Sequence, residues 1–98
     1  MWNTIITNAI NNKHLIEVTY DRDIRLVEPH VLGYKNSKLE LLAWQLNNYA
    51  EASLTNDWRT FEIQKITNVK ATTKNFLGAR PTRSYSHPSW TQIIVKVS

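Results

Sequence analysis

Two arginines and two aromatic residues near the carboxyl terminus have the side chains that bind single-stranded nucleic acid. Arg80, Arg83, Tyr85 and Trp90 lie within residues 63–98, which contain six Lys or Arg and no Asp or Glu. Guanidinium groups contact phosphates, and aromatic rings stack on bases. This composition predicts a tail that binds RNA or single-stranded DNA. A solvated basic face that only keeps the protein soluble accounts for the charge equally well.

A third arginine whose side chain suits anion binding lies in the run Trp58 to Ile66. Alternation along this run places Arg59 on the same face as Phe61 and Ile63, two core-type residues. An arginine that faces a core needs an anionic partner, either from the chain or from a ligand. Arg59 is therefore the cation that is hardest to interpret as ordinary surface.

The composition argues against an enzyme. The chain has no cysteine, only two glycines, and three histidines, His14, His30 and His87, which are far apart in the sequence. These residues provide no thiol nucleophile and no glycine-rich phosphate loop. Ser84, Ser86 and Ser89 lie in an irregular segment without the context of a nucleophile elbow. We expect no catalytic residues, no metal and no cofactor.

The elements that position these residues begin with a helix over residues 1–13. Its apolar residues recur at helical spacing, Asn3 or Thr4 can cap it, and Asn11-Asn12-Lys13 ends it. Strand-type alternation follows up to Tyr20, and a charged turn leads into a run over 24–34. Pro29 removes a backbone donor from that run, which predicts an edge strand or a bend. Gly33 and residues 35–37 form the next predicted turn.

The strongest strand pattern is Lys38 to Trp44, around which the other elements are arranged. Residues 46–57 are small and polar and predict a loop before the Trp58 to Ile66 strand. A fifth strand follows over 66–73. Residues 74–98 lose the alternation, with Phe76, Tyr85 and Trp90 as expected anchors, until a last strand at Ile93 to Val97. The predicted strands span 15–73, followed by an irregular tail with that last strand.

One short helix and five or six short strands predict a mainly β fold. Ninety-eight residues suit a single domain with one core. Barrel closure is how short strands avoid leaving open edges, so a small, strongly bent antiparallel barrel is expected.

The order of these features resembles the WYL domain, a Sm-like or SH3-like barrel found mostly in bacterial transcriptional regulators and in regulators of phage defence. The resemblance covers roughly residues 3–76. It rests on the order and spacing of the run LELLAW and of the following residues: Ala9, Ile10, Tyr20, Arg25, Val27, Pro29, Leu32, Arg59, Phe61, Ile63, Lys65 and Ile66.

The chain departs from the family pattern at three points. The tripeptide that names the family falls on Leu39-Glu40-Leu41, so both aromatic residues are missing and a carboxylate replaces the tyrosine. Lys65 stands where the family usually has an arginine, which keeps the charge but loses the planar fork. Too few residues precede the helix for a helix-turn-helix, so we expect a solitary domain.

The resemblance implies a sensor that binds an anionic ligand, such as a nucleotide or single-stranded nucleic acid, through a basic and aromatic patch. The family pattern assigns Tyr20, Arg25, Arg59 and Lys65 to this site, with Phe61 in support. His30 and Trp44 are added because they are near these residues in the pattern.

Each of these residues also has a structural interpretation. Arg25 can pair with Asp23, Glu28 or Glu40 on a neighbouring strand. Phe61 and Trp44 are of types more often found in a core than at a ligand. His30 is of a type that often packs or caps, and Tyr20 can cover the end of the barrel.

Two other functions stay open. The basic tail can be the nucleic-acid binder, or the barrel can be an assembly module that forms a homo-oligomer through an exposed strand edge without a ligand. A regulated protein partner is expected in the sensor interpretation. No apolar run is long enough to cross a bilayer, so we expect no membrane partner and a cytoplasmic location.

Overall fold

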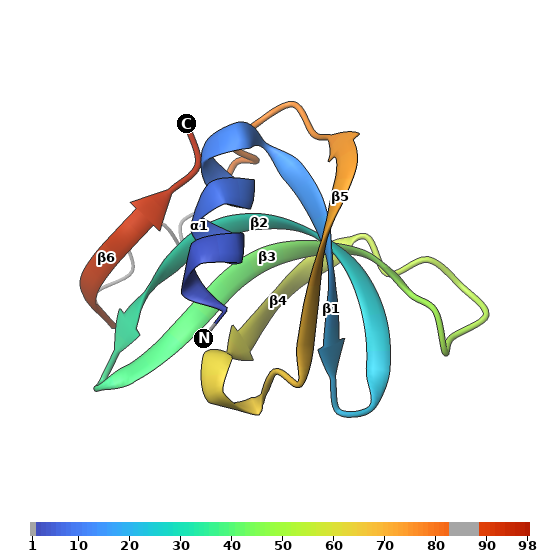
Figure 1. The fold of residues 1–98 in the computed structure, drawn as a ribbon, viewed down its shortest axis with the longest axis horizontal. Coiled ribbons are helices and arrows are strands. Elements are labelled where there is room, and N and C mark those ends of the chain that lie inside the picture. The colour runs from blue at the N-terminus through green and yellow to red at the C-terminus, as the bar shows by residue number, and fades with distance from the viewer. Residues whose placement is uncertain (1, 83–88) are drawn as a thin grey trace.

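A computed structural model of the chain describes residues 2–82 and 89–98. Within these residues one α-helix, six strands and a short 3-10 helix follow one another (Figure 1). Their bounds are α1 Asn3–Asn12, β1 His14–Tyr20, β2 Asp23–Lys35, β3 Lys38–Asn48, β4 Asp57–Glu62, η1 Ile63–Lys65, β5 Asn68–Asn75 and β6 Trp90–Lys96.

The strands form one antiparallel sheet in the order β4-β3-β2-β1-β5, and β6 pairs with β2 outside this order. The sheet curls strongly, and α1 lies across one end of it, between β5 and β6 (Figure 1). The fold is therefore the expected mainly β, Sm-like or SH3-like antiparallel barrel with a short amino-terminal helix. The barrel is not strictly closed, since β4 and β5 end the order of strands.

Two tight turns set the register of the first three strands. Asp21 and Arg22 join β1 to β2, and Asn36 and Ser37 join β2 to β3, all four with φ between 50° and 71°. Two-residue turns with positive φ at both positions match the twist of the strands that they connect. Asp and Asn tolerate this conformation better than most residues, which lets the chain make both turns without glycine.

Strand β2 is the centre of the sheet and not an edge. Its first half pairs with β1, its second half with β6, and β3 runs along its whole length. The edge expected from Pro29 is wrong, but the expected bend is confirmed by a register shift between Pro29 and Val31. Gly33 lies inside the strand and not in a turn. It pairs with Ile93 of β6, whose backbone comes so close that a Cβ atom at position 33 would clash with it.

The remaining differences from the expected elements are local. The strand that begins before Trp58 ends at Glu62, and residues 63–65 form the 3-10 helix η1. β3 continues to Asn48, into the predicted loop, and β5 runs two residues later than expected. The helix ends where expected, but Trp2 is its N-cap residue and no side chain caps it.

The core fills the concave side of the sheet beneath α1. Ile6, Ala9 and Ile10 of the helix are buried against it, which explains the apolar stripe of α1. The strands contribute alternate residues, as the sequence pattern predicts, and Phe61 is 1% exposed. The other buried residues of the core come from the strands, from η1 and from the segments beside them: Ile16, Val18, Val27, Leu32, Leu41, Ala43, Phe61, Ile63, Ile66, Val69 and Val97.

Candidate functional site

Tyr20, Arg25 and Phe61 meet at one rim of the barrel. The rings of Tyr20 and Phe61 pack edge to face with centroids 4.9 Å apart. The guanidinium carbon of Arg25 lies 5.7 Å from the Tyr20 ring centroid and 5.9 Å from that of Phe61. Three of the five residues that the family pattern assigns to a ligand site are therefore in direct contact.

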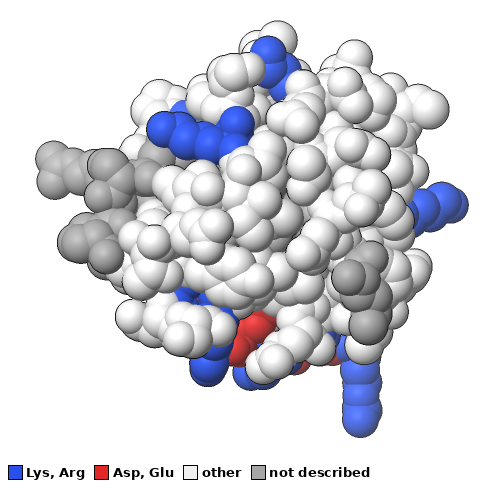
Figure 2. Space-filling model, turned by 60° about the vertical axis from the view of Figure 1, so that its left-hand side comes forward, with Lys and Arg blue, Asp and Glu red and all other residues white. Residues whose placement is uncertain are grey.

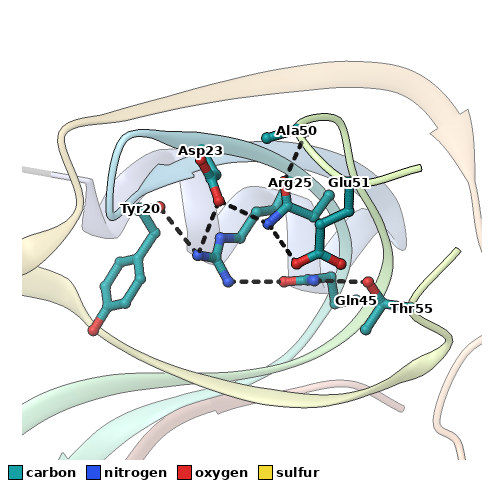
Figure 3. A network of polar contacts seen from close by, with 8 residues as sticks. Tyr20, Asp23, Arg25, Gln45, Ala50, Glu51 and Thr55 are labelled. Atoms are coloured by element: carbon teal, nitrogen blue, oxygen red, sulfur yellow. Dashed lines mark hydrogen bonds and ion pairs between the residues drawn. The ribbon is translucent and has the colours of Figure 1, made fainter. Parts of the chain in front are cut away.

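Arg25 is the least well satisfied cation at this rim. Its side chain is only 14% exposed, and its nearest carboxylate oxygen, on Asp23, is 3.9 Å away. Its Nη2 donates to the carbonyl of Tyr20 at 3.2 Å, and its Nη1 donates to Gln45 Oε1 at 3.4 Å (Figure 3). Among the described residues, no acceptor meets its Nε–H. The guanidinium is thus largely desolvated without a close anionic partner.

A polar network behind Arg25 holds Asp23 in place. Asn48 Nδ2 donates to Asp23 Oδ2 at 3.0 Å and to Glu51 Oε1 at 3.4 Å, and its Oδ1 accepts from the Ala50 N–H (Figure 3). Asp23 therefore shares one oxygen between Asn48 and Arg25. Of the alternatives for an Arg25 ion pair, Asp23 is the one within 4 Å, at a long distance.

Gln45 and Asn48 are site residues that the sequence analysis did not identify. Both are 1% exposed, and both lie on β3 beyond the apolar run that predicts the strand. Gln45 also donates to Thr55 Oγ1 at 2.9 Å, so it ties Arg25 to the loop before β4. Continued alternation past Trp44, which places Gln45 on the face of Leu41 and Ala43, is the signal that could have found it.

Arg59 lies on the same face of β4 as Phe61, opposite the buried Ala43 on β3. The parity expected from the sequence is therefore confirmed at the backbone. The side chain is nevertheless 40% exposed, because β4 begins two residues earlier and Arg59 turns to Asp57 at 3.3 Å. Its Nη1 also donates to the Trp58 carbonyl at 2.8 Å. The anionic partner that the sequence requires is a 65% exposed aspartate.

Lys65 reaches the rim through Glu62. Its Nζ lies 2.7 Å from Glu62 Oε2, and the Glu62 backbone N–H donates to the Tyr20 hydroxyl at 3.3 Å. Hydrogen bonds from Lys65 and then Lys38 lower the pKa of Glu62, and Glu62 in turn raises the pKa of Lys65. Lys65 is 59% exposed. Lys65 is therefore a solvent-facing cation near Tyr20 that already forms an ion pair with Glu62.

His30 and Trp44 lie elsewhere, on the outer face of the sheet. Trp44 packs edge to face on Trp58 at 5.4 Å, and His30 packs on Trp58 at 4.9 Å and stacks on Phe76 at 5.4 Å. On β3 and β4, the pair Trp44 and Trp58 alternates with Ala43 and Arg59. The predicted list of ligand residues is thus divided between the rim and the opposite face.

The tail candidates are likewise separated. Arg80 forms an ion pair with Glu28, whereas Trp90 begins β6 with the Lys35 ammonium 4.4 Å from its ring centroid. Arg83 and Tyr85 lie outside the described residues. The nucleic-acid-binding tail stays a prediction.

Basic side chains do not merge into one patch on the face shown in Figure 2. There, Lys and Arg side chains lie apart around the margin, and most of the surface between them is uncharged. A cleft of about 460 Å³ lies between the start of α1, the β2–β3 turn and η1, with Glu62 and Lys38 in its wall. No cluster of three His, Asp or Glu that could hold a metal occurs in residues 2–82 and 89–98.

The chain is similar to one known protein family. The family model of the WYL domain matches residues 3–71, which include α1, β1 to β4 and the first half of β5. No curated protein and no solved structure matches the chain. Over the residues described, no helix has the length and apolar character needed to cross a membrane.

Proposed function

The chain belongs to the WYL domain family, and from this premise we propose that it binds an anionic ligand at the rim where Tyr20, Arg25 and Phe61 meet, with Arg59 and Lys65 as further cations of the site. WYL domains are generally regulatory, ligand-sensing domains and not enzymes. The ligand class proposed is a nucleotide or single-stranded nucleic acid. Regulation of transcription or of phage defence is the role that the family suggests for such a sensor.

The observation that carries this proposal is the state of Arg25. A guanidinium that is 14% exposed, with its nearest carboxylate oxygen at 3.9 Å and an Nε–H without an acceptor in the described residues, has lost hydration without gaining a close counterion. Hydrogen bonds from charged donors to phosphate contribute about 1.5–3 kcal/mol. An anion at the rim would supply the acceptor that residues 2–82 and 89–98 do not.

The neighbouring groups support the same ligand class. Arg59 pairs with the exposed Asp57, and Lys65 pairs with Glu62; the side chains of the two cations are 40% and 59% exposed. Exposed ion pairs of this kind contribute little stability, so a phosphate can compete for the cations at low cost. Tyr20 is partly exposed beside them and adds an aromatic surface.

The test is a fluorescence anisotropy titration with labelled single-stranded RNA, single-stranded DNA and duplex DNA at two salt concentrations. Arg59→Ala should weaken binding by about tenfold or more and reduce the salt dependence by about one phosphate contact. Lys74→Ala is the matched control, because it removes one exposed charge on β5, away from the rim. Equal losses in both variants would show general electrostatic attraction and would contradict a site at the rim.

Assembly without a ligand is the second candidate. In the described chain, β4, β5 and β6 each pair with one neighbouring strand only. Edges of this kind can add a strand from another subunit. Sedimentation velocity distinguishes the two functions: assembly predicts a concentration-dependent oligomer in the absence of any anion, whereas a monomer at all concentrations would exclude it.

A further inference from the structure

The outer face of the sheet holds the Arg80 side chain through an ion pair and a cation–π contact. Nε and Nη2 of Arg80 donate to the two carboxylate oxygens of Glu28, at 2.7 Å and 3.0 Å. The guanidinium carbon lies 4.4 Å from the centroid of the Trp44 ring. The ion pair with Glu28 is bidentate, and the guanidinium stacks on the indole. This combination fits the planar guanidinium of arginine and not the ammonium of lysine.

The same pocket also binds the backbone of residue 80. The Arg80 N–H donates to His30 Nε2 at 3.3 Å, and His30 Nδ1 lies 2.8 Å from the Glu28 carbonyl. Nε2 accepts and Nδ1 must donate, so the imidazole is neutral with its proton on Nδ1. Burial lowers the pKa of His30, which supports the neutral form. Both the side chain and the main chain of one residue are recognised.

The pocket residues Glu28 and Trp44 differ from Arg80 in burial and in their relation to the family match. Glu28 and Trp44 lie on β2 and β3, inside the residues that match the WYL family, and the Glu28 side chain is 7% exposed. Arg80 lies beyond the match, and its side chain is 41% exposed. The buried carboxylate of Glu28 requires a cation, and Arg80 supplies it from the solvent-exposed side of the pocket.

Residues on both sides of Arg80 are exposed to solvent. Leu77 is fully exposed, and Ala79 and Pro81 are exposed as well. A cleft of about 350 Å³ lies between this segment, Glu28 and Leu15. Segments with few buried contacts open locally at low free-energy cost. Release of Arg80 from the pocket would be a local opening of this kind.

We propose that the pocket of Glu28, His30 and Trp44 is an arginine-recognition site whose present occupant is Arg80, and that an arginine-bearing, extended segment of a partner protein replaces Arg80 there. Charge selects the partner, because a buried carboxylate excludes acidic and nucleic-acid ligands. The fork and the indole select arginine over lysine. This site lies on the opposite face from the rim and does not depend on anion binding there.

The first test is chemical rescue of the full chain carrying Arg80→Ala. Removing the counterion of a buried carboxylate should lower the melting temperature by about 4 °C or more. Millimolar N-acetyl-argininamide should restore part of this loss, N-acetyl-lysinamide should not, and neither should change the wild type. No rescue by argininamide, or equal rescue by lysinamide, would overturn the proposal. If Arg80→Ala does not fold, Arg80→Lys gives the same comparison with a cation retained.

The second test measures recognition of a peptide. A synthetic peptide with the sequence of residues 76–82 should bind Arg80→Ala saturably in isothermal titration calorimetry and should bind the wild type more weakly, because Arg80 competes. The same peptide with lysine at the arginine position should bind at least about tenfold more weakly. Adding Glu28→Gln to Arg80→Ala should abolish binding. Binding that survives Glu28→Gln, or that does not distinguish arginine from lysine, would refute a guanidinium site.

Discussion

Gly33→Ala tests how the carboxy-terminal strand is attached to the barrel. A Cβ atom at position 33 would lie 2.5 Å from the Gln92 carbonyl oxygen and 3.1 Å from the Ile93 Cα. The ring of Trp90 would lie 3.1 Å away as well. Two of these three contacts are backbone atoms of β6, which cannot turn aside as a flexible side chain can. The methyl group must therefore push β6 away from β2 or separate the strands locally.

The magnitude follows from the size of the overlap. A carbon and an oxygen in ordinary contact lie at about 3.3–3.6 Å, so β6 must shift by about 1 Å at Gln92. Overpacking of this kind costs typically about 1–3 kcal/mol. Urea unfolding should show a loss in that range. Hydrogen exchange should locate the loss in β6 and in Val31 to Lys35 of β2, while β1 and β3 keep their protection.

The control for this experiment trims the same strand without a clash. Gln92→Ala removes an exposed side chain but keeps the carbonyl oxygen, so the free energy of unfolding should change by less than about 0.5 kcal/mol. If Gly33→Ala is as stable as the wild type and the amides of β6 exchange at unchanged rates, the close approach of β6 to Gly33 is incorrect.

Two further predictions concern the core and the outer face. Phe61→Ala should lower the free energy of unfolding by about 3–5 kcal/mol, because the ring is 1% exposed and contacts Tyr20; a change below about 1 kcal/mol in urea unfolding would contradict its core position. His30 should make stability depend on pH. Its folded-state pKa is lowered, first by burial, while Glu28 raises it and Arg80 lowers it further. The unfolded chain therefore binds the proton more readily, so stability is fully present above about pH 7.5 and declines as the pH falls through about 6.5 towards the folded pKa. Titration of the His30 ring by NMR checks this prediction, and a midpoint at or above 6.5 would refute it.

The sequence is a good guide to the elements whose patterns are local. Alternation predicts β1 and most of β3, and helical spacing predicts the buried residues Ile6, Ala9 and Ile10 of α1. The polar turns after Tyr20 and at residues 35–37 also follow from residue types. These signals depend on neighbours within a few positions, so the chain itself carries them.

The sequence is a poor guide where distant segments decide the structure. Gly33 looks like a turn residue, but its role is to admit the backbone of β6, about sixty residues later in the chain. The run from Trp58 continues its alternation through Ile63, yet the strand ends at Glu62 and a 3-10 turn follows. Both outcomes depend on packing against other strands, which no local pattern contains.

The sequence identifies some neighbours in the candidate site and misses others, because only some of them follow from local patterns. The family pattern assigns Tyr20, Arg25 and Phe61, and these are in contact. Trp44 is close to these residues in the sequence pattern, but it follows Ala43 directly on β3, so its side chain points to the opposite face of the sheet. The pairing of Glu28 with Arg80 spans 52 residues and has no signal in composition or spacing.

An anion bound at the rim around Arg25 should be visible in a ¹⁵N NMR titration of the full chain with a single-stranded oligonucleotide at low salt, following backbone amides and arginine Nε–H groups. We expect saturable shifts at Tyr20, Arg25, Arg59 and Lys65, with the Arg25 Nε–H moving downfield as it gains an acceptor. Saturable binding that leaves Arg25 unchanged and shifts only residues 76–98 would refute anion binding at this rim.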